Sequence, residues 1–363
     1  MSATRVAQRR RHIGRPAARQ AFEFSFCGPS EPMKACVDIG GTRVAVGLVH
    51  EHVPGGLVAR RSEATATSGS PDAVVLQVMR MVEQASAEAG VDANEVNELG
   101  VAAPGPFLLR EGLVELTTPH ICGGLAGLSR GLPNGWLSAP SKAPLRRRFG
   151  RVRVENVGVA ALEAERRWGA LQGFAHCAHV SRGAGIGVGL CVDGRVLRGK
   201  NRNAAHAGHS FVTDSNADAA LCGCGNVGDG ESLVAGDAIE RRFGHSASTL
   251  FMAAARGDAQ ALRKADGLCT VVGRLLFNLV TTLDLQAIGL GGSVFWHHRQ
   301  FLLPRLRAAV EACLPSMTAG VLVVPAGLGD QVTGCAALAL LAGTVPDPRP
   351  PQAMPSPRAE LVA

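Results

Sequence analysis

The chain of 363 residues contains no tyrosine, and aromatic residues make up only 4% of it. Its hydrophobic core must therefore be packed mainly by aliphatic side chains and glycine rather than by rings. No uncharged apolar run of about 18 residues or more is present, so we expect no membrane-spanning helix. No apolar segment follows the basic N-terminus, so we expect no secretory signal peptide either.

Close cysteine pairs are almost absent as well. The chain has 10 cysteines, but only Cys222 and Cys224 are separated by a single residue. The others are scattered singly, several of them in apolar stretches, as Cys36 and Cys177 are. This pattern favours buried, reduced thiols in a cytoplasmic protein over a disulfide framework.

Acidic residues are missing from residues 1–20, which contain six of the arginines. The formal net charge of the chain is +7, so removing this +6 leaves about +1 for the remainder. The nearly neutral remainder does not indicate a nucleic-acid partner, and the basic segment is too short for a DNA-binding domain. We expect residues 1–33 to be a disordered extension and the proline-rich residues 344–363 to be a disordered tail.

One pattern of strand, glycine turn and strand occurs twice, over residues 34–49 and 179–197. The repetition suggests a duplicated architectural unit, and alternating strands and helices between and after the two copies predict an α/β fold. The helices expected from apolar periodicity cover residues 72–89, 157–170, 232–243, 258–264, 267–283, 299–313 and 331–342. Further strands are expected at residues 152–156, 287–292 and 321–325, and residues 99–107 are expected to be a short strand that runs into a Pro-Gly-Pro loop.

Both glycine turns suit the binding of an anion. Adjacent glycines let backbone N–H groups approach a phosphate without interference from a Cβ atom. Two such turns in one chain suggest two clamps on one polyphosphate, and the residues expected to hold its phosphates are Asp38, Gly40, Gly41, Thr42, Gly183 and Gly185. The later pair Gly291 and Gly292 would suit adenosine lying flat against the backbone.

An ordered series of motifs resembles the ROK family, named for repressor, open reading frame and kinase. The series is DIGGT, APGP, PNGW, VEN, GAGIGVGL, AAHAGH, CGCGNVGDGE and GLGGS, and it runs through residues 34–342. The resemblance implies a two-lobed, actin/hexokinase-like fold with duplicated ribonuclease H-like units. The small lobe would hold residues 34–154 and 326–343, and the large lobe residues 155–325. The resemblance also implies that the protein uses ATP and Mg²⁺ and that a sugar hydroxyl accepts the phosphoryl group.

The resemblance also implies an acceptor site and a metal site. The residues expected to contact the acceptor are Gly105, Asn134, Asn156, His206, His209 and Glu231. The residues expected to bind a structural Zn²⁺ are His209, Cys222, Cys224 and Asp229. Asp229 replaces the family's last cysteine, and because carboxylates also bind zinc, both a zinc site and a metal-free loop stay open.

The chain departs from the family at three positions of the expected site. Val157 stands where the family has the aspartate that takes the proton from the attacking hydroxyl, so no catalytic base is assigned. Ala184 replaces a threonine that donates to phosphate, and His206 replaces a carboxylate that accepts from the sugar. His206 is the candidate surrogate base, whereas Glu155 should point to the opposite face of its strand from Asn156.

Two hypotheses follow for the function. The first is an ATP-dependent kinase that phosphorylates a hydroxyl, in particular a primary one, of a sugar or sugar-like cyclitol. The second is a carbohydrate sensor or regulator on the same fold whose catalysis is weak or lost, as Val157 and Ala184 suggest. We expect a small-molecule substrate, a homodimer, no membrane and no nucleic acid as partners.

Overall fold

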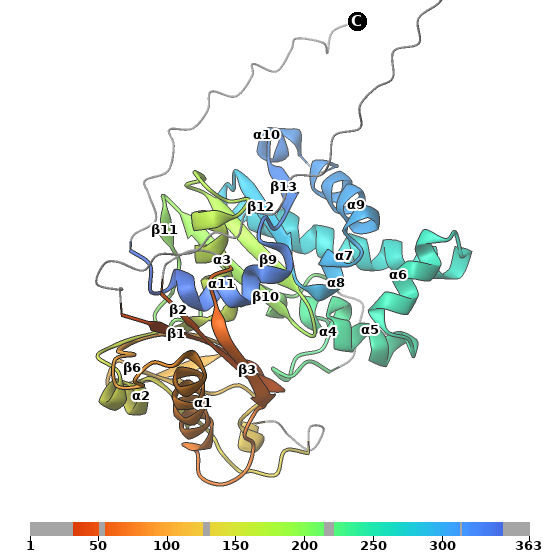
Figure 1. The fold of residues 1–363 in the computed structure, drawn as a ribbon. Coiled ribbons are helices and arrows are strands. Elements are labelled where there is room, and N and C mark those ends of the chain that lie inside the picture. Colours follow the sequence, from red (N-terminus) through yellow and green to blue (C-terminus); the bar gives the residue numbers. More distant parts are fainter. Residues whose placement is uncertain (1–31, 51–54, 126–130, 214–220, 313, 344–363) are drawn as a thin grey trace, which may run out of the picture. The chain divides into compact units, whose positions relative to one another are not determined.

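Figure 1 shows the computed structural model, which describes residues 32–50, 55–125, 131–213, 221–312 and 314–343. Apart from Pro32 and Met33, the predicted N-terminal extension lies outside these residues, and so does the predicted tail. The first of its sheets has the strand order β3-β2-β1-β4-β8. Its strands are β1 (Lys34–Ile39), β2 (Arg43–Val49), β3 (Val58–Ala64), β4 (Glu98–Ala103) and β8 (Arg151–Asn156).

The second sheet repeats this plan with the strand order β11-β10-β9-β12-β13. In both sheets an antiparallel unit of three successive strands is extended by two parallel strands. The strands are β9 (Cys177–Arg182), β10 (Ile186–Val192), β11 (Arg195–Val196), β12 (Ala287–Gly291) and β13 (Leu322–Pro325). The predicted duplication is therefore confirmed, and the shared order places the turns after β1 and after β9 at equivalent positions.

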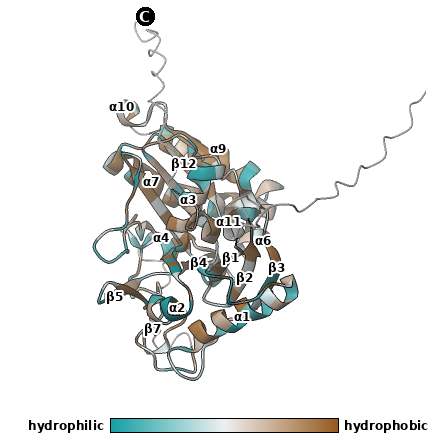
Figure 2. Ribbon diagram, turned by 60° about the vertical axis from the view of Figure 1, so that its left-hand side comes forward, coloured by the Kyte–Doolittle hydropathy of each residue, from teal (hydrophilic) through white to brown (hydrophobic). Residues whose placement is uncertain are grey.

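Helices on opposite faces cover the first sheet. Helix α1 (Ala73–Ala89) packs against β2 and β3, and Figure 2 shows it coloured in both teal and brown, as expected for a helix with one apolar side. Helix α11 (Val332–Ala339) contacts β1 and β4. Cys36 and Asp38 alternate in β1 with Val37 and Ile39, which pack in the α1-side core.

Helix α3 (Val157–Trp168) joins the two halves of the fold. It begins directly after β8 of the first sheet and packs against β10 of the second and against α11. A Cβ atom at Gly158 would lie 2.5 Å from the carbonyl oxygen of Val188, so only glycine allows this close approach of helix and strand. The start of α3 is thereby fixed beside the second glycine turn.

The largest hydrophobic core lies between the second sheet and a group of helices. These are α4 (Gly230–Val234), α5 (Gly236–Phe243), α6 (Ala247–Ala255), α7 (Ala259–Leu283), α8 (Ser293–Trp296) and α9 (Arg299–Glu311), while α10 (Pro315–Thr318) packs against α7 and α9. Among the described helices only α7 is long and apolar enough to cross a membrane, yet it packs against α6 and α9 and contributes many residues to this core. It is a core helix.

Several local predictions need correction. The predicted helices 258–264 and 267–283 form one helix, because Ala265 and Leu268 are anchored in the core on either side of the exposed Gly267. The predicted helix 232–243 is divided, since Ala235 between α4 and α5 has an extended conformation. The predicted loop 120–144 contains a short 3-10 helix, and α2 (Lys142–Arg148) begins near its end.

A small third sheet was not predicted. It consists of β5 (Phe107–Arg110), β6 (Leu113–Leu116) and β7 (Ala139–Pro140). The remaining short elements are 3-10 helices at Gly123–Leu125, Ala207–His209 and Gly329–Gln331. The loop after β6 returns toward the first glycine turn, and this position matters for the site.

Candidate active site

The first glycine turn joins β1 to β2 and is tightly braced. The N–H of Gly40 donates to the carbonyl of Arg43 at 2.8 Å, and the Thr65 hydroxyl donates to the carbonyl of Gly40 at 2.8 Å. A Cβ atom on Gly41 would lie 2.6 Å from the Cβ of His120. His120 therefore fills part of the space beside Gly41 where the sequence predicts a bound anion.

Asp38 lies near the end of β1, immediately before this turn. Asp38 lines a cavity of ≈ 550 Å³ together with residues of β2, β3 and α11. Burial raises the pKa of Asp38 to about 6. The carboxylate is thus costly to ionise in this position, and a bound cation would offset that cost.

The second glycine turn carries a predicted acceptor residue against its backbone. The Gly183 N–H donates to the carbonyl of Gly185 at 2.9 Å, which closes the turn. Glu231, at the start of α4, accepts from the N–H of Ile186 through Oε2 at 2.8 Å. A Cβ atom on Gly185 would lie 2.8 Å from the same oxygen. Predicted phosphate and acceptor residues therefore meet here.

His206, Asn156 and Gly105 form a second point of contact. A Cβ atom on Gly105 would clash with Nε2 of His206 and would lie 2.9 Å from Nδ2 of Asn156. The Nδ1–H of His206 donates to the carbonyl of Asn203 at 3.0 Å, and because a carbonyl can only accept, Nε2 keeps its lone pair. Burial lowers the pKa of His206, which favours this neutral form.

Asn156 and Val157 stand at the junction of β8 and α3. The Oδ1 of Asn156 accepts from the N–H of Gly158 at 2.8 Å and caps the helix. Val157 is the first residue of the helix and presents an aliphatic side chain. The position that the resemblance assigns to the base therefore lies at a positive helix terminus but carries no proton acceptor.

Glu155 is engaged elsewhere, as its place in the strand predicts. This buried residue accepts through Oε1 from Arg198 at 2.7 Å and from Arg202 at 2.6 Å. Its carboxylate is held by two guanidinium groups, so it is not available to take a proton from an acceptor.

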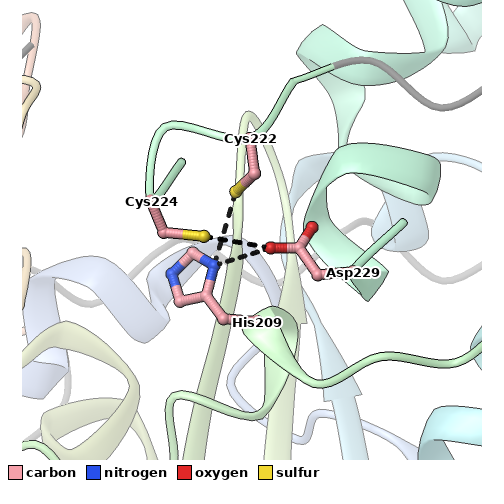
Figure 3. A group of neighbouring side chains, drawn as sticks. All are labelled: His209, Cys222, Cys224 and Asp229. Atoms are coloured by element: carbon pink, nitrogen blue, oxygen red, sulfur yellow. Dashed lines mark hydrogen bonds and ion pairs between the residues drawn. The ribbon is translucent and has the colours of Figure 1, made fainter. Parts of the chain in front are cut away.

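The predicted metal ligands lie together. Figure 3 shows His209, Cys222, Cys224 and Asp229 turned toward one another, and their ligand atoms all lie within 4.8 Å of one another. His209 Nδ1 lies 3.4 Å from Cys222 Sγ and 3.3 Å from Asp229 Oδ2, to which Cys224 Sγ donates at 3.2 Å. A nitrogen, two sulfurs and a carboxylate oxygen suit the tetrahedral coordination of Zn²⁺.

The protonation of this group follows from its contacts. Burial acts to raise the pKa of Asp229, but hydrogen bonds from His209 and from the N–H of Ser232 outweigh it and lower that pKa to about 2. The hydrogen bond to Asp229 raises the pKa of His209, and burial raises the pKa of both Cys222 and Cys224. In the metal-free form the two thiols therefore keep their protons while the Asp229 carboxylate is ionised, and a metal ion bound by the thiolates would displace the thiol protons.

A small pocket beside the second glycine turn reveals residues that the sequence did not single out. His120, from the loop after β6, and Arg241, from α5, line it together with Ala184, Gly185 and Glu231. His120 lies 64 residues before Ala184 in the chain, so only the fold brings them together. No motif or periodicity marks either residue.

Asn134 and the glycine pair have structural explanations of their own. The Asn134 amide donates to the carbonyls of Thr67 and Ile121 and accepts from two backbone N–H groups, so it braces its own loop. A Cβ atom on Gly292 would clash with the backbone of Arg182, and one on Gly291 would lie 2.9 Å from His179. Their predicted contacts with acceptor and adenosine stay predictions.

Comparison with known proteins gives the chain its relatives. A glucokinase from Aeropyrum pernix is 28% identical over 330 residues, which cover 84% of this chain and 95% of that protein. An N-acetylmannosamine kinase from Salmonella newport is 29% identical over 265 residues, covering 71% and 82%. The structure of a ROK family glucokinase from Streptomyces griseus in complex with glucose and AMPPNP has a TM-score of 0.66 at 27% identity, covering 85% and 99%.

The fold agrees with these relatives, and the two similar sheets are those of the actin/hexokinase-like architecture expected from the sequence. The ROK family model matches residues 34–343, which include both sheets, both glycine turns and the His209 group. The chain belongs to the ROK family.

Proposed function

We propose that the chain is an ATP- and Mg²⁺-dependent kinase that transfers the γ-phosphoryl group of ATP to a hydroxyl of a sugar or sugar-like cyclitol. The observation that carries this proposal is the contact between Glu231 and the second glycine turn, through the 2.8 Å hydrogen bond to Ile186. It supports the proposal because the carboxylate expected to bind the acceptor lies directly beside the backbone expected to bind phosphate. Kinases need this juxtaposition because phosphoryl transfer depends mainly on positioning and charge neutralisation.

In the proposed reaction the two glycine turns would bind the nucleotide, and nearby side chains would bind the acceptor. The backbone around Gly40 and Gly183 would hold the phosphates of ATP, and Mg²⁺ near Asp38 would neutralise their charge. Glu231, Asn156 and His209 would hold the hydroxyls of the acceptor. The attacking oxygen forms a bond to the γ-phosphorus while the bond to the β-phosphate oxygen breaks, and the hydroxyl proton leaves to a base.

His206 is the best candidate for that base. Its Nε2 carries a lone pair and faces Gly105 and Asn156, where the acceptor is expected. Val157 cannot accept a proton, and Glu155 is bound by two arginines. The loss of the family's aspartate would lower the rate by about 10²–10⁴ unless His206 compensates.

The acceptor is expected to differ from an ordinary hexose at the edge that His206 faces. A carboxylate only accepts hydrogen bonds, whereas an imidazole with one protonated nitrogen accepts at one atom and donates at the other. In this chain the donor is already committed to Asn203. A cyclitol that keeps a primary hydroxyl but changes this edge fits the proposal. The use of ATP and the reduced thiols favour the cytoplasm as the compartment of the protein.

A Zn²⁺ ion held by His209, Cys222, Cys224 and Asp229 is part of the proposal. It would fix the imidazole of His209 and the loop that leads to Glu231, and its role would be structural. We expect about one zinc per chain, measured by elemental analysis of the purified protein, and a fall in thermal stability after chelation. Absence of zinc, with unchanged stability after chelation, would show that the loop is metal-free.

The decisive experiment incubates the purified protein with ATP and Mg²⁺ and a panel of acceptors, followed by mass detection of phosphorylated product. The panel should contain glucose, N-acetylmannosamine, other hexoses and amino sugars, and cyclitols with a primary hydroxyl. We expect one class of acceptor to give product. Measurable binding of a sugar without product from any acceptor would refute the kinase and support the alternative, a sensor on the same fold, which Val157 favours.

A further inference from the structure

The loop after β6 carries one side chain into the site from a distant part of the chain. His120 follows Thr118, a fully buried residue whose carbonyl accepts from the N–H groups of Ile121 (3.1 Å) and Cys122 (2.9 Å). The Thr118 hydroxyl also lies 3.4 Å from the N–H of His120. The backbone that presents the imidazole is therefore fixed by hydrogen bonds, and the position of His120 is built into the fold.

The imidazole lies between the two glycine turns. On one side it packs against Gly41, where an added Cβ atom would lie 3.1 Å from its Cγ and 3.3 Å from its Nδ1. On the other side it lines the small pocket that also contains Ala184 and Gly185. His120 is thus in reach of a group held by both turns.

Ala184 makes this position significant. The resemblance expects a threonine here, and its hydroxyl would donate to phosphate, whereas Ala184 has no donor. His120 lines the same pocket as Ala184, and an imidazole carries a ring N–H that can donate. The transferred phosphoryl group spreads negative charge over its equatorial oxygens, and donors aimed at those oxygens stabilise the transition state.

We propose that His120 is a catalytic residue that donates a hydrogen bond to the transferred γ-phosphoryl group and replaces the donor missing at Ala184. This inference rests on the proposed function, since it names a further residue of the same site. Arg241, on α5, also lines the pocket and is exposed. His120 is distinguished from it by its direct packing on the first glycine turn.

Nucleotide binding tests the inference even without an acceptor. We expect H120A to weaken the binding of AMPPNP with Mg²⁺ by about tenfold or more, and to leave ADP binding unchanged, because only AMPPNP carries a γ-phosphoryl group. H120Q keeps a side-chain donor of similar length and should restore part of the affinity. The matched control is H245A, which removes an exposed histidine just after α5. Calorimetric titration measures the affinity of the unmodified chain, H120A, H120Q and H245A for both nucleotides.

Kinetics and a second substitution sharpen the test. With the preferred acceptor, kcat of H120A should fall by about 10²-fold, and A184T in the same chain should recover part of the loss. Equal AMPPNP affinity in H120A and the unmodified chain, or an equal loss for AMPPNP and ADP, overturns the inference. Failure of the proposed function is distinguishable, because it leaves AMPPNP binding dependent on His120 but yields no product with any acceptor.

Discussion

Replacing Val157 with aspartate should increase the rate of phosphoryl transfer. Val157 is the first residue of α3 and directly follows Asn156, so the new carboxylate would stand where the family places its base. A general base contributes about 10²–10⁴ in rate. This corresponds to a lowering of the barrier by about 3–5 kcal/mol.

The fold should tolerate the change. Val157 is only partly buried, so its replacement loses about 1 kcal/mol of apolar burial. A negative charge in the first turn of a helix is favoured by about 0.3–1 kcal/mol, which offsets part of this loss. The expected change in stability is therefore several-fold smaller than the expected change in the barrier.

The assay is the steady-state kcat of V157D with ATP, Mg²⁺ and the preferred acceptor. V157N is the matched control, because it has nearly the same shape and polarity but cannot accept a proton at neutral pH. If V157D is no faster than V157N while both bind acceptor and fold normally, the base does not limit this enzyme. A rise near the low end of the range would indicate that His206 already takes the proton.

Three further predictions concern stability. Burial raises the pKa of Asp38 to about 6, well above its unfolded value, so the ionised side chain destabilises the protein above pH 6. D38N should therefore raise the free energy of unfolding by about 1–3 kcal/mol at pH 7. Urea titrations should show that this gain disappears toward pH 4. E155Q should lower the free energy of unfolding by about 1–3 kcal/mol, since Arg198 loses its buried partner. It should leave kcat within a few-fold of normal, and a complete loss of kcat in folded protein would make Glu155 the base. G158A should destabilise by about 1–3 kcal/mol because its Cβ would meet the Val188 backbone, and an unchanged melting temperature would show that α3 can shift freely.

The sequence was most informative where one residue type is needed for a chemical reason. The glycine turns and the duplicated unit could be predicted from the residues themselves, and the grouping of His209 with Cys222 could be predicted from the resemblance to the family. Helix boundaries were less predictable. Gly267 suggested an interruption, but burial of Ala265 and Leu268 outweighs the cost of about 1 kcal/mol for a glycine inside a helix.

Glycines also show how one pattern can have two causes. Gly41 was predicted to leave room for phosphate, and the structure shows His120 occupying part of that room. Gly292 was predicted to contact adenosine, yet its lack of a side chain is explained by its approach to the backbone of Arg182. A sequence records that a Cβ atom is excluded but not which neighbour excludes it.

The sequence by itself determined the family, the α/β class and the absence of a proton acceptor at Val157, because each depends on which residues are present and in what order. Only the tertiary structure decided which atoms face the site. It fixed the tautomer of His206 through Asn203, held Glu231 against the second turn and brought His120 to the first. These are contacts between segments far apart in the chain, and they exist only once the packed sheets and helices bring those segments together.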